Sequence, residues 1–226
     1  MDRLHRTRLL FGDTGVQKLQ NATVMVVGCG AVGSFATEAL ARSGVGHLIV
    51  VDFDTVERTN INRQLFALES TVGKPKVDVA AMRIRDINPD TRVDALNMFF
   101  DDNNTPGIIP DFIIDAIDTV ESKVALYKWA HKHNIPFISS MGAASKTDPT
   151  QIKIAPISKT TVCPLASRVR KMVRDIDLPD FPVAYSMERP APVTGHAKNL
   201  GSVITVTGAF GLILANWVIG QIIHNN

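Results

Sequence analysis

The first chemical signature in the chain is a set of three glycines: Gly28, Gly30 and Gly33 have the spacing G-x-G-x-x-G, with Ala31 directly after the second. An apolar run precedes them and apolar positions at helical spacing follow, so the loop should join a strand to a helix N-terminus. Glycines here permit a tight turn and a close approach of phosphate to backbone N–H groups, while the helix dipole favours negative charge. The loop therefore predicts a nucleotide site without specifying the nucleotide.

An aspartate, Asp52, lies 19 residues after Gly33, at the end of a second apolar run. A carboxylate at the C-terminal end of this strand accepts hydrogen bonds from ribose hydroxyls in dinucleotide-binding proteins. The alternative is a solvated carboxylate at a strand end. To this point, an NAD-dependent dehydrogenase explains the pattern as well as an ATP-dependent enzyme does.

Two cations in the segment after Asp52, Arg63 and Lys76, are candidate phosphate ligands, and Asn60 is a neutral amide near them. If the nucleotide at the glycine loop carries a chain of phosphates, the negative charge of that chain must be stabilised. The planar guanidinium of Arg63 and the compact ammonium of Lys76 suit this task, with Asn60 as a neutral donor beside them. We expect both cations to be exposed in a cleft; a solvated helix and loop surface is the alternative.

A further carboxylate, Asp118, follows an apolar run and an earlier aspartate, Asp115. Ligands collect at the C-terminal edge of a parallel sheet, which makes Asp118 a candidate site residue. Two alternatives stay open: Asp115 as an orienting partner, and Asp118 as a cap for the helix expected from residue 120.

The elements that must position these residues alternate between strand and helix. Apolar runs predict buried strands at residues 22–28, 47–52, 92–97, 112–116 and 136–140. Helical spacing of apolar residues predicts helices at 31–43, 76–88 and 120–133. This alternation predicts an α/β, Rossmann-like, doubly wound and mostly parallel sheet.

Beyond residue 142 the pattern changes. Residues 148–157 predict an extended edge segment, and 164–175 an amphipathic helix. Residues 178–201, rich in proline, predict a long loop. We expect one domain over 1–226, with a nucleotide-binding part at 20–142 and a C-terminal extension at 143–226 for substrate and dimer contacts, packed on the same domain.

Composition excludes several classes of protein. The 226 residues are 45% hydrophobic and 20% charged, as in soluble globular proteins. The net charge of +2 is too small to indicate a nucleic-acid binder by itself. The two cysteines, Cys29 and Cys163, form no C-x-x-C pair, which argues against a disulfide framework and a four-cysteine zinc site and favours a cytoplasmic protein.

The C-terminal segment 203–223 contains no charged residue and is long enough to span a bilayer. Its polar residues and its glycines Gly208, Gly211 and Gly220 instead favour a helix packed closely inside the protein. We therefore expect a buried helix and no stable membrane insertion.

The segment from Asp52 to Gln64, followed by Gly73-Lys-Pro-Lys76, resembles the D-x-D-x-V-x-x-x-N-x-x-R-Q and G-x-x-K signatures of E1-like adenylating enzymes. The resemblance implies ATP and Mg2+ as cofactors, with Asp118 as the magnesium ligand. It also implies a homodimer in which Arg8 acts in trans at the partner's ATP site; a disordered basic tail is the alternative. The nucleotide-binding residues so implied are Gly28, Gly30, Ala31, Gly33, Asp52, Asp54, Asn60, Arg63, Lys76 and Asp118.

The C-terminal half is similar to the tRNA threonylcarbamoyladenosine dehydratases in the segments 148–154, 158–160, 163–166 and 185–188. With the earlier motifs, the resemblance extends over residues 8–224. It implies that ATP adenylates the threonyl carboxylate of N6-threonylcarbamoyladenosine, next to the anticodon. An internal nucleophile then closes a ring and releases AMP. No enzyme cysteine is obligatory, and we interpret Cys163 and Cys29 as structural.

For the tRNA, the candidate surface is a basic stripe on the helix at 164–175, in which Arg168, Arg170, Lys171 and Arg174 should point into solvent. The apolar residues of the same helix can face the core: Leu165, Val169, Met172 and Val173. An ordinary solvated helix face is the alternative. The main rival function is activation of the C-terminus of a ubiquitin-like or sulfur-carrier protein, which a cysteine desulfurase or sulfur-acceptor partner would accompany. The absence of C-x-x-C pairs weakens that interpretation.

Overall fold

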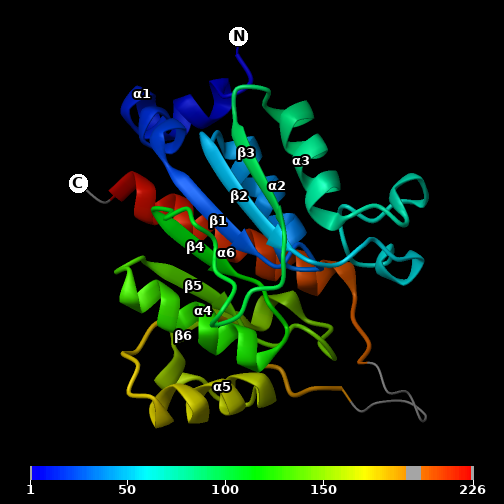
Figure 1. Ribbon diagram of the computed structural model, residues 1–226, viewed down its shortest axis with the longest axis vertical. Coiled ribbons are helices and arrows are strands. Elements are labelled where there is room, and N and C mark those ends of the chain that lie inside the picture. The colour runs from blue at the N-terminus through cyan, green and yellow to red at the C-terminus, as the bar shows by residue number, and fades with distance from the viewer. Residues whose placement is uncertain (1, 192–199, 225–226) are drawn as a thin grey trace.

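The computed structural model describes residues 2–191 and 200–224, and at its centre lies a seven-stranded sheet in the order β3-β2-β1-β4-β5-β7-β6 (Figure 1). All neighbouring strands are parallel except the edge pair β6 and β7. The strands are β1 Thr23–Val27, β2 His47–Asp52, β3 Arg92–Asn97, β4 Phe112–Asp115, β5 Phe137–Ser140, β6 Ile152–Pro156 and β7 Pro182–Ser186. The predicted α/β, Rossmann-like fold is confirmed.

Helices cover both faces of this sheet. They are α1 His5–Asn21, α2 Gly33–Ser43, α3 Lys76–Ile87, α4 Val120–Lys132, α5 Pro164–Asp175 and α6 Ile204–His224. Short 3-10 turns are η1 Arg58–Asn60, η2 Glu69–Thr71, η3 Pro149–Gln151 and η4 Ile157–Lys159. Along β1 the side chains alternate between two cores: Val24 and Val26 pack with α2, α3 and α6, whereas Met25 and Val27 pack with α4. Burial on both faces explains why this strand is apolar throughout.

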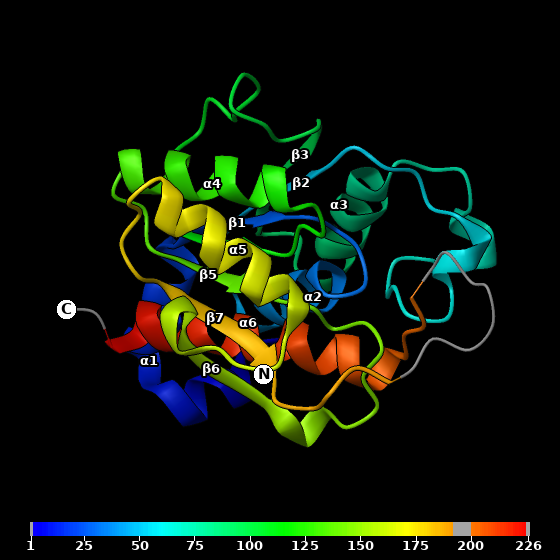
Figure 2. The ribbon, with the colours of Figure 1, turned by 90° about the horizontal axis from the view of Figure 1, so that it is seen from below.

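Helix α6 lies across one face of the sheet and packs mainly against α2, while α4 and α5 lie side by side on the other face (Figure 2). Gly211 permits the close α6–α2 contact, because a Cβ there would lie 2.3 Å from the carbonyl oxygen of Val32. The interpretation of these glycines as packing residues is confirmed at Gly211 and at Gly208, which abuts Phe35. By length and composition alone α6 could cross a membrane, and half of its most apolar window is buried within the protein.

The expectation of a long loop over 178–201 is wrong for its first part, which contains β7. This strand is buried and pairs with both β5 and β6, so the C-terminal extension contributes two strands to the central sheet. Its apolar core is short and follows several prolines, and Pro182 occupies the first strand position, where a missing N–H is tolerated. Residues 192–199 of the expected loop lie outside the described residues.

Candidate active site

The glycine loop joins β1 to α2 at the C-terminal edge of the sheet. Gly28 has φ +94°, and a Cβ there would lie 2.6 Å from the carbonyl oxygen of Ala116. A Cβ at Gly33 would lie 1.7 Å from the carbonyl oxygen of Gly28. Side chains are therefore excluded at both positions. A Cβ at Gly30 would meet only the side chain of Gln64, at 3.8 Å. Near the start of α2 the N–H groups of Ser34 and Ala36 donate to the carbonyls of Gly30 and Val32, so the helix N-terminus favours an anion mainly through its dipole and the remaining loop N–H groups.

The carboxylate of Asp52 fastens the glycine loop to the end of β2. One oxygen accepts the backbone N–H of Cys29 at 2.6 Å, and the other accepts that of Asp54 at 2.8 Å. Burial raises the pKa of Asp52 above its ordinary value, although both hydrogen bonds and nearby Lys76 oppose that shift. A carboxylate has about four lone-pair sites, so two are left for ribose hydroxyls.

Lys76 is brought to the glycine loop by the pairing of two short segments, 54–56 and 73–76. Val56 donates to the carbonyl of Lys74, Gly73 donates to that of Val56, and Thr55 and Pro75 form an isolated bridge. Lys76 touches Asp54 twice: its backbone N–H donates to the Asp54 carbonyl at 3.0 Å and its Nζ to Oδ2 at 2.6 Å.

The expectation that Lys76 would be exposed is wrong, because its side chain is only 7% exposed and is ion-paired with Asp54. Its charge also lowers the pKa values of Asp52 and Cys29 against the larger effect of burial. The ammonium of Lys76 is thus held in a fixed place beside the glycine loop.

Asn60 is the last residue of η1 and Arg63 lies in the turn that follows, and the side chains of both contact their own segment. The Arg63 guanidinium donates to the Thr59 carbonyl at 2.7 Å and to Asn62 Oδ1 at 3.0 Å, and the side chain is half-buried. Asn60 is buried, and its Oδ1 accepts the backbone N–H of Glu57 at 3.1 Å. Contact of Arg63 with a phosphate requires its side chain to turn away from these partners.

Asp118 lies in the exposed loop between β4 and α4. The capping alternative is wrong, because the N-cap residue of α4 is Thr119. Within the described part of the chain, Asp118 has no hydrogen bond or ion pair. An exposed carboxylate at this edge fits a Mg2+ ion that takes its other ligands from ATP phosphates and water. Among the described residues, no group of three or more His, Cys, Asp or Glu side chains could hold a metal unaided.

Asp115 is an internal residue rather than a ligand-facing one. It is fully buried and forms an ion pair with Lys123 of α4 at 2.8 Å. Tyr127 and Ser139 also donate to it. The interpretation of Asp115 as an orienting partner is compatible with this arrangement. Sequence reasoning missed Lys123 and Tyr127, although both lie at helical spacing from the apolar Val120.

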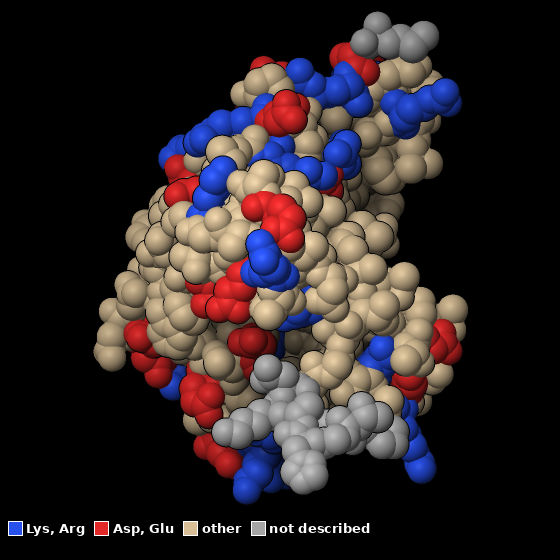
Figure 3. Space-filling view, turned by 90° about the vertical axis from the view of Figure 1, so that its right-hand side faces the viewer, with Lys and Arg blue, Asp and Glu red and all other residues tan. Residues whose placement is uncertain are grey.

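A cavity of about 360 Å3 opens next to Asp118, lined by Phe99, Asp101, Asp102, Asn103, Thr119, Glu121, Ser122 and Ala125. None of the glycine-loop residues lines it. On the face seen in Figure 3, basic and acidic side chains are interspersed rather than separated. The surface near the candidate site is therefore not a uniform basic patch.

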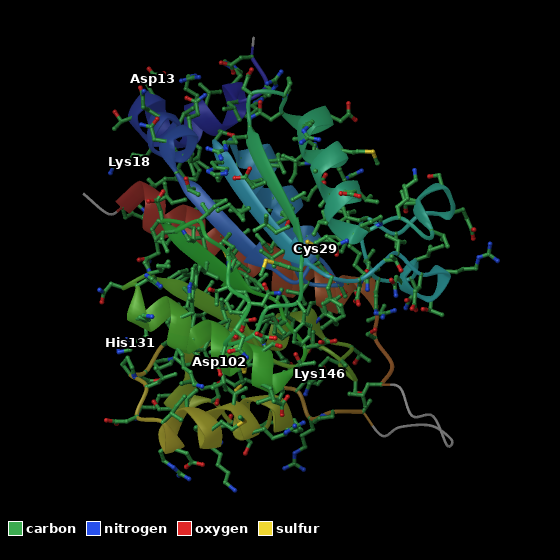
Figure 4. The ribbon with its side chains drawn as sticks, viewed as in Figure 1. Asp13, Lys18, Cys29, Asp102, His131 and Lys146 are labelled. Carbon is green, nitrogen blue, oxygen red and sulfur yellow. The ribbon has the colours of Figure 1, made fainter. Side chains whose placement is uncertain are left out.

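Arg8 belongs to α1, so the alternative of a disordered basic tail is wrong. It pairs with Asp13 at 2.6 Å and with Asp2 at 3.1 Å. Figure 4 shows Asp13 far from Cys29 of the glycine loop. Arg8 therefore does not join the other candidate residues within a single chain. Next to it, Leu9 and Leu10 are 68% and 74% exposed.

The four cations of the basic stripe on α5 differ in exposure, because one of them is hydrogen-bonded within the protein. Val169 and Val173 are buried as predicted, and Leu165 and Met172 are half-buried. Arg168, Lys171 and Arg174 are exposed. Arg170 instead donates to the carbonyl of Thr160 at 2.9 Å and to its hydroxyl at 2.6 Å, so the prediction that it points into solvent is wrong.

Cys163 and Cys29 are both buried. Cys163 precedes α5 and packs in the core beneath that helix, which agrees with a structural interpretation. Burial raises the pKa of the Cys29 thiol well above its ordinary value. Sequence reasoning also missed Lys146, a buried lysine in the loop after β5 that donates to the carbonyl of Glu188 and whose pKa is lowered by burial (Figure 4).

The ThiF family model matches residues 4–226, and the chain belongs to the ThiF family. The tRNA threonylcarbamoyladenosine dehydratase of Bacillus subtilis is 51% identical over 177 residues, which are 77% of this chain and 70% of that protein.

Solved structures agree with this relationship. The E. coli tRNA N6-threonylcarbamoyladenosine dehydratase TcdA in complex with AMP has a TM-score of 0.92 and 34% identity, covering 97% of this chain and 93% of that chain. Its complex with ATP has a TM-score of 0.91 over the same shares.

Proposed function

We propose that this protein is an ATP-dependent tRNA threonylcarbamoyladenosine dehydratase, which converts N6-threonylcarbamoyladenosine next to the anticodon into its cyclic form. The observation that carries the proposal is the position of the Lys76 ammonium, buried against Asp54 beside the glycine loop. Relatives with the same name, one of them 51% identical, and the E. coli structures in complex with ATP and AMP support the choice of nucleotide and substrate.

In the first step, the chain's own groups hold ATP for attack by the threonyl carboxylate. The glycine-loop N–H groups and the N-terminus of α2 bind phosphate, and Asp52 accepts the ribose hydroxyls. Lys76 and Arg63 stabilise the charge that develops on the phosphates as pyrophosphate leaves. Mg2+, held by Asp118, would supply further neutralisation of the phosphates.

In the second step, a nucleophile within the same modified base attacks the acyl adenylate and expels AMP. Because this nucleophile is already tethered to the acyl group, a high effective molarity drives ring closure. No enzyme thiol is required. The burial of Cys163 and of Cys29 supports a route without a covalent enzyme intermediate.

The proposal includes a homodimer in which Arg8 of one chain completes the ATP site of the other. Two observations support it: Arg8 is remote from the glycine loop of its own chain, and the adjacent Leu9 and Leu10 expose large apolar side chains (Figure 4). It further includes a single domain over 1–226, a cytoplasmic location and tRNA contacts by Arg168, Lys171 and Arg174.

Mass spectrometry of nucleosides tests the function directly. Incubation of threonylcarbamoylated tRNA with the protein, ATP and Mg2+ should convert the modified nucleoside to a product lighter by one water, with one AMP formed per product. The rival function predicts pyrophosphate exchange driven by a ubiquitin-like or sulfur-carrier protein and none driven by the tRNA. That result would overturn the proposal.

A further inference from the structure

A buried ion pair lies directly beneath the loop that carries Asp118. Nζ of Lys123 is 2.8 Å from Oδ2 of Asp115, and neither side chain has any exposed surface. The hydroxyls of Tyr127 and Ser139 donate to the same oxygen at 2.8 and 2.5 Å. Removing two charges from water is costly, and a well-packed apolar pair of similar volume is often as stable or more so. Stability alone therefore does not account for the pair.

The pair reaches both loops that flank it at the C-terminal edge of the sheet. The second oxygen of Asp115 accepts the backbone N–H of Ile117 at 3.0 Å, one residue before Asp118. Lys123 also donates to the carbonyl of Ser140, the last residue of β5, at 2.8 Å. The loop after β4 is thus tied from below to α4 and to the neighbouring strand.

Asp118 itself has no hydrogen bond or ion pair within the described residues and is exposed. The position of its carboxylate consequently depends on the backbone that precedes it. Two hydrogen bonds hold this backbone: the Ala116 N–H donates to the carbonyl of Val27 at 2.8 Å, and the Ile117 N–H donates to Asp115. Lys123, Tyr127 and Ser139 in turn hold the Asp115 carboxylate that Ile117 needs.

We propose that Asp115 and Lys123 are positioning residues for Asp118, which hold its carboxylate where Mg2+ and the ATP phosphates meet. This inference rests on the proposed function, in which Asp118 is the magnesium ligand. Neither residue touches substrate. Partners of this kind, one contact removed from a ligand, typically change metal affinity or activity about 10- to 100-fold when mutated.

The first test is Lys123→Met in the full-length protein, which removes the ammonium and keeps most of the side-chain volume. We expect kcat for AMP formation to fall about 10- to 100-fold, while KM for the modified tRNA changes little. A second readout does not depend on turnover: the Kd for ATP is measured with Mg2+ and with EDTA. Mg2+ should tighten ATP binding less in the variant than in the wild type, with equal affinities in EDTA.

The matched control is Ile84→Ala, which truncates a buried side chain of α3 and so leaves a cavity in the core. It separates positioning from a general loss of stability, because Ile84 contributes nothing to the loop after β4. Both variants are compared well below their Tm values. The inference would be overturned if Mg2+ tightened ATP binding as much in Lys123→Met as in the wild type. It would also be overturned if Ile84→Ala lost this effect of Mg2+ to the same extent as Lys123→Met.

A milder variant covers the case in which Lys123→Met does not fold. Tyr127→Phe combined with Ser139→Ala removes two donors to Asp115 and leaves the ion pair in place. Hydrogen exchange of residues 116–119 should be faster than in the wild type, and the effect of Mg2+ on ATP binding should be smaller. Unchanged values of both would overturn the inference. If wild-type protein binds ATP with Mg2+ but does not convert the modified tRNA, the proposed function fails while these binding readouts still test the positioning role.

Discussion

The residues beside the glycine loop and the proposed tRNA surface on α5 hold their charged groups in opposite ways. Beside the glycine loop, Asp52 and Lys76 are both buried. Asp52 accepts the backbone N–H of Cys29, and Lys76 is ion-paired with Asp54. On α5, Arg168, Lys171 and Arg174 are exposed, and the weak contact of Arg174 to Asp175 is at 4.0 Å. A group that stabilises charge in a transition state must already be in place, whereas a phosphate contact that only adds affinity tolerates a mobile side chain. Of these cations, Lys76 is the one already held in place beside the glycine loop.

The largest effect should follow from removing the buried cation. Lys76→Ala should lower kcat/KM for AMP formation by about 100- to 1,000-fold, the usual cost of one preorganised charge-stabilising group. It should also destabilise the protein, because Asp54 loses its partner. The measurement is AMP release together with urea unfolding. Lys74→Ala is the matched control, since the Lys74 side chain is exposed two residues away. Comparable losses in both variants would contradict the assignment.

The next prediction tests the proposal that Arg8 completes the ATP site of the partner chain. Arg8→Ala and Asp118→Ala homodimers should each be strongly impaired, because each lacks one component of every site. Mixed dimers should recover about one competent site in two, since one site then holds both residues. Differently tagged chains allow the mixed species to be purified and its AMP formation measured. Absence of recovery would argue that Arg8 acts within its own chain or only through its pairs with Asp2 and Asp13.

The same contrast explains which features the sequence predicts. The bounds of β2 and α5 agree with prediction, because an uninterrupted apolar run and an amphipathic period are local signals. The glycine loop is also predictable, since its glycines are required by close approaches within a strand–loop–helix unit. What is local in the chain can be predicted from the chain.

Other features depend on interactions between distant segments. The burial of Lys76 results from the pairing of 54–56 with 73–76, which no local pattern reveals. β7 is stabilised by β5 and β6, so its short apolar core within a proline-rich segment gives a weak signal. Arg170 looks like its exposed neighbours on α5, but Thr160 lies within reach of its guanidinium only in the folded protein.

A smaller effect is expected on the tRNA side. Replacing Arg168, Lys171 and Arg174 together by serine should weaken tRNA binding and reduce the salt dependence of log Kd, by up to about one unit of slope for each phosphate that is no longer neutralised. The Kd for ATP should not change, because these side chains lie on a different element from the glycine loop. Fluorescence anisotropy at several salt concentrations measures this. Arg85→Ser on α3 is the control, and equal losses of tRNA affinity would indicate an ordinary solvated face.

The smallest expected effect concerns the buried carboxylate that fastens the glycine loop. Because burial raises the pKa of Asp52 above its ordinary value of 3.8, the folded state takes up a proton at a higher pH than the unfolded state does. The contribution of Asp52 to stability is therefore greatest below the unfolded pKa and is lost as pH rises through the folded pKa. Asp52→Asn cannot titrate and provides the reference.

Relative to Asp52→Asn, the wild-type free energy of unfolding should fall as pH rises from the unfolded to the folded pKa of Asp52, and it should be constant above that range. The fall should be about 1.4 kcal/mol for each unit of pKa shift. Urea unfolding from about pH 3 to 7 measures it. ATP affinity should change in the opposite direction, weakening toward acid, because protonation removes an acceptor for the ribose hydroxyls. A pH-independent difference in unfolding would mean that the hydrogen bonds from Cys29 and Asp54 cancel the effect of burial, and a rise with pH would mean that they outweigh it; either result would contradict the prediction.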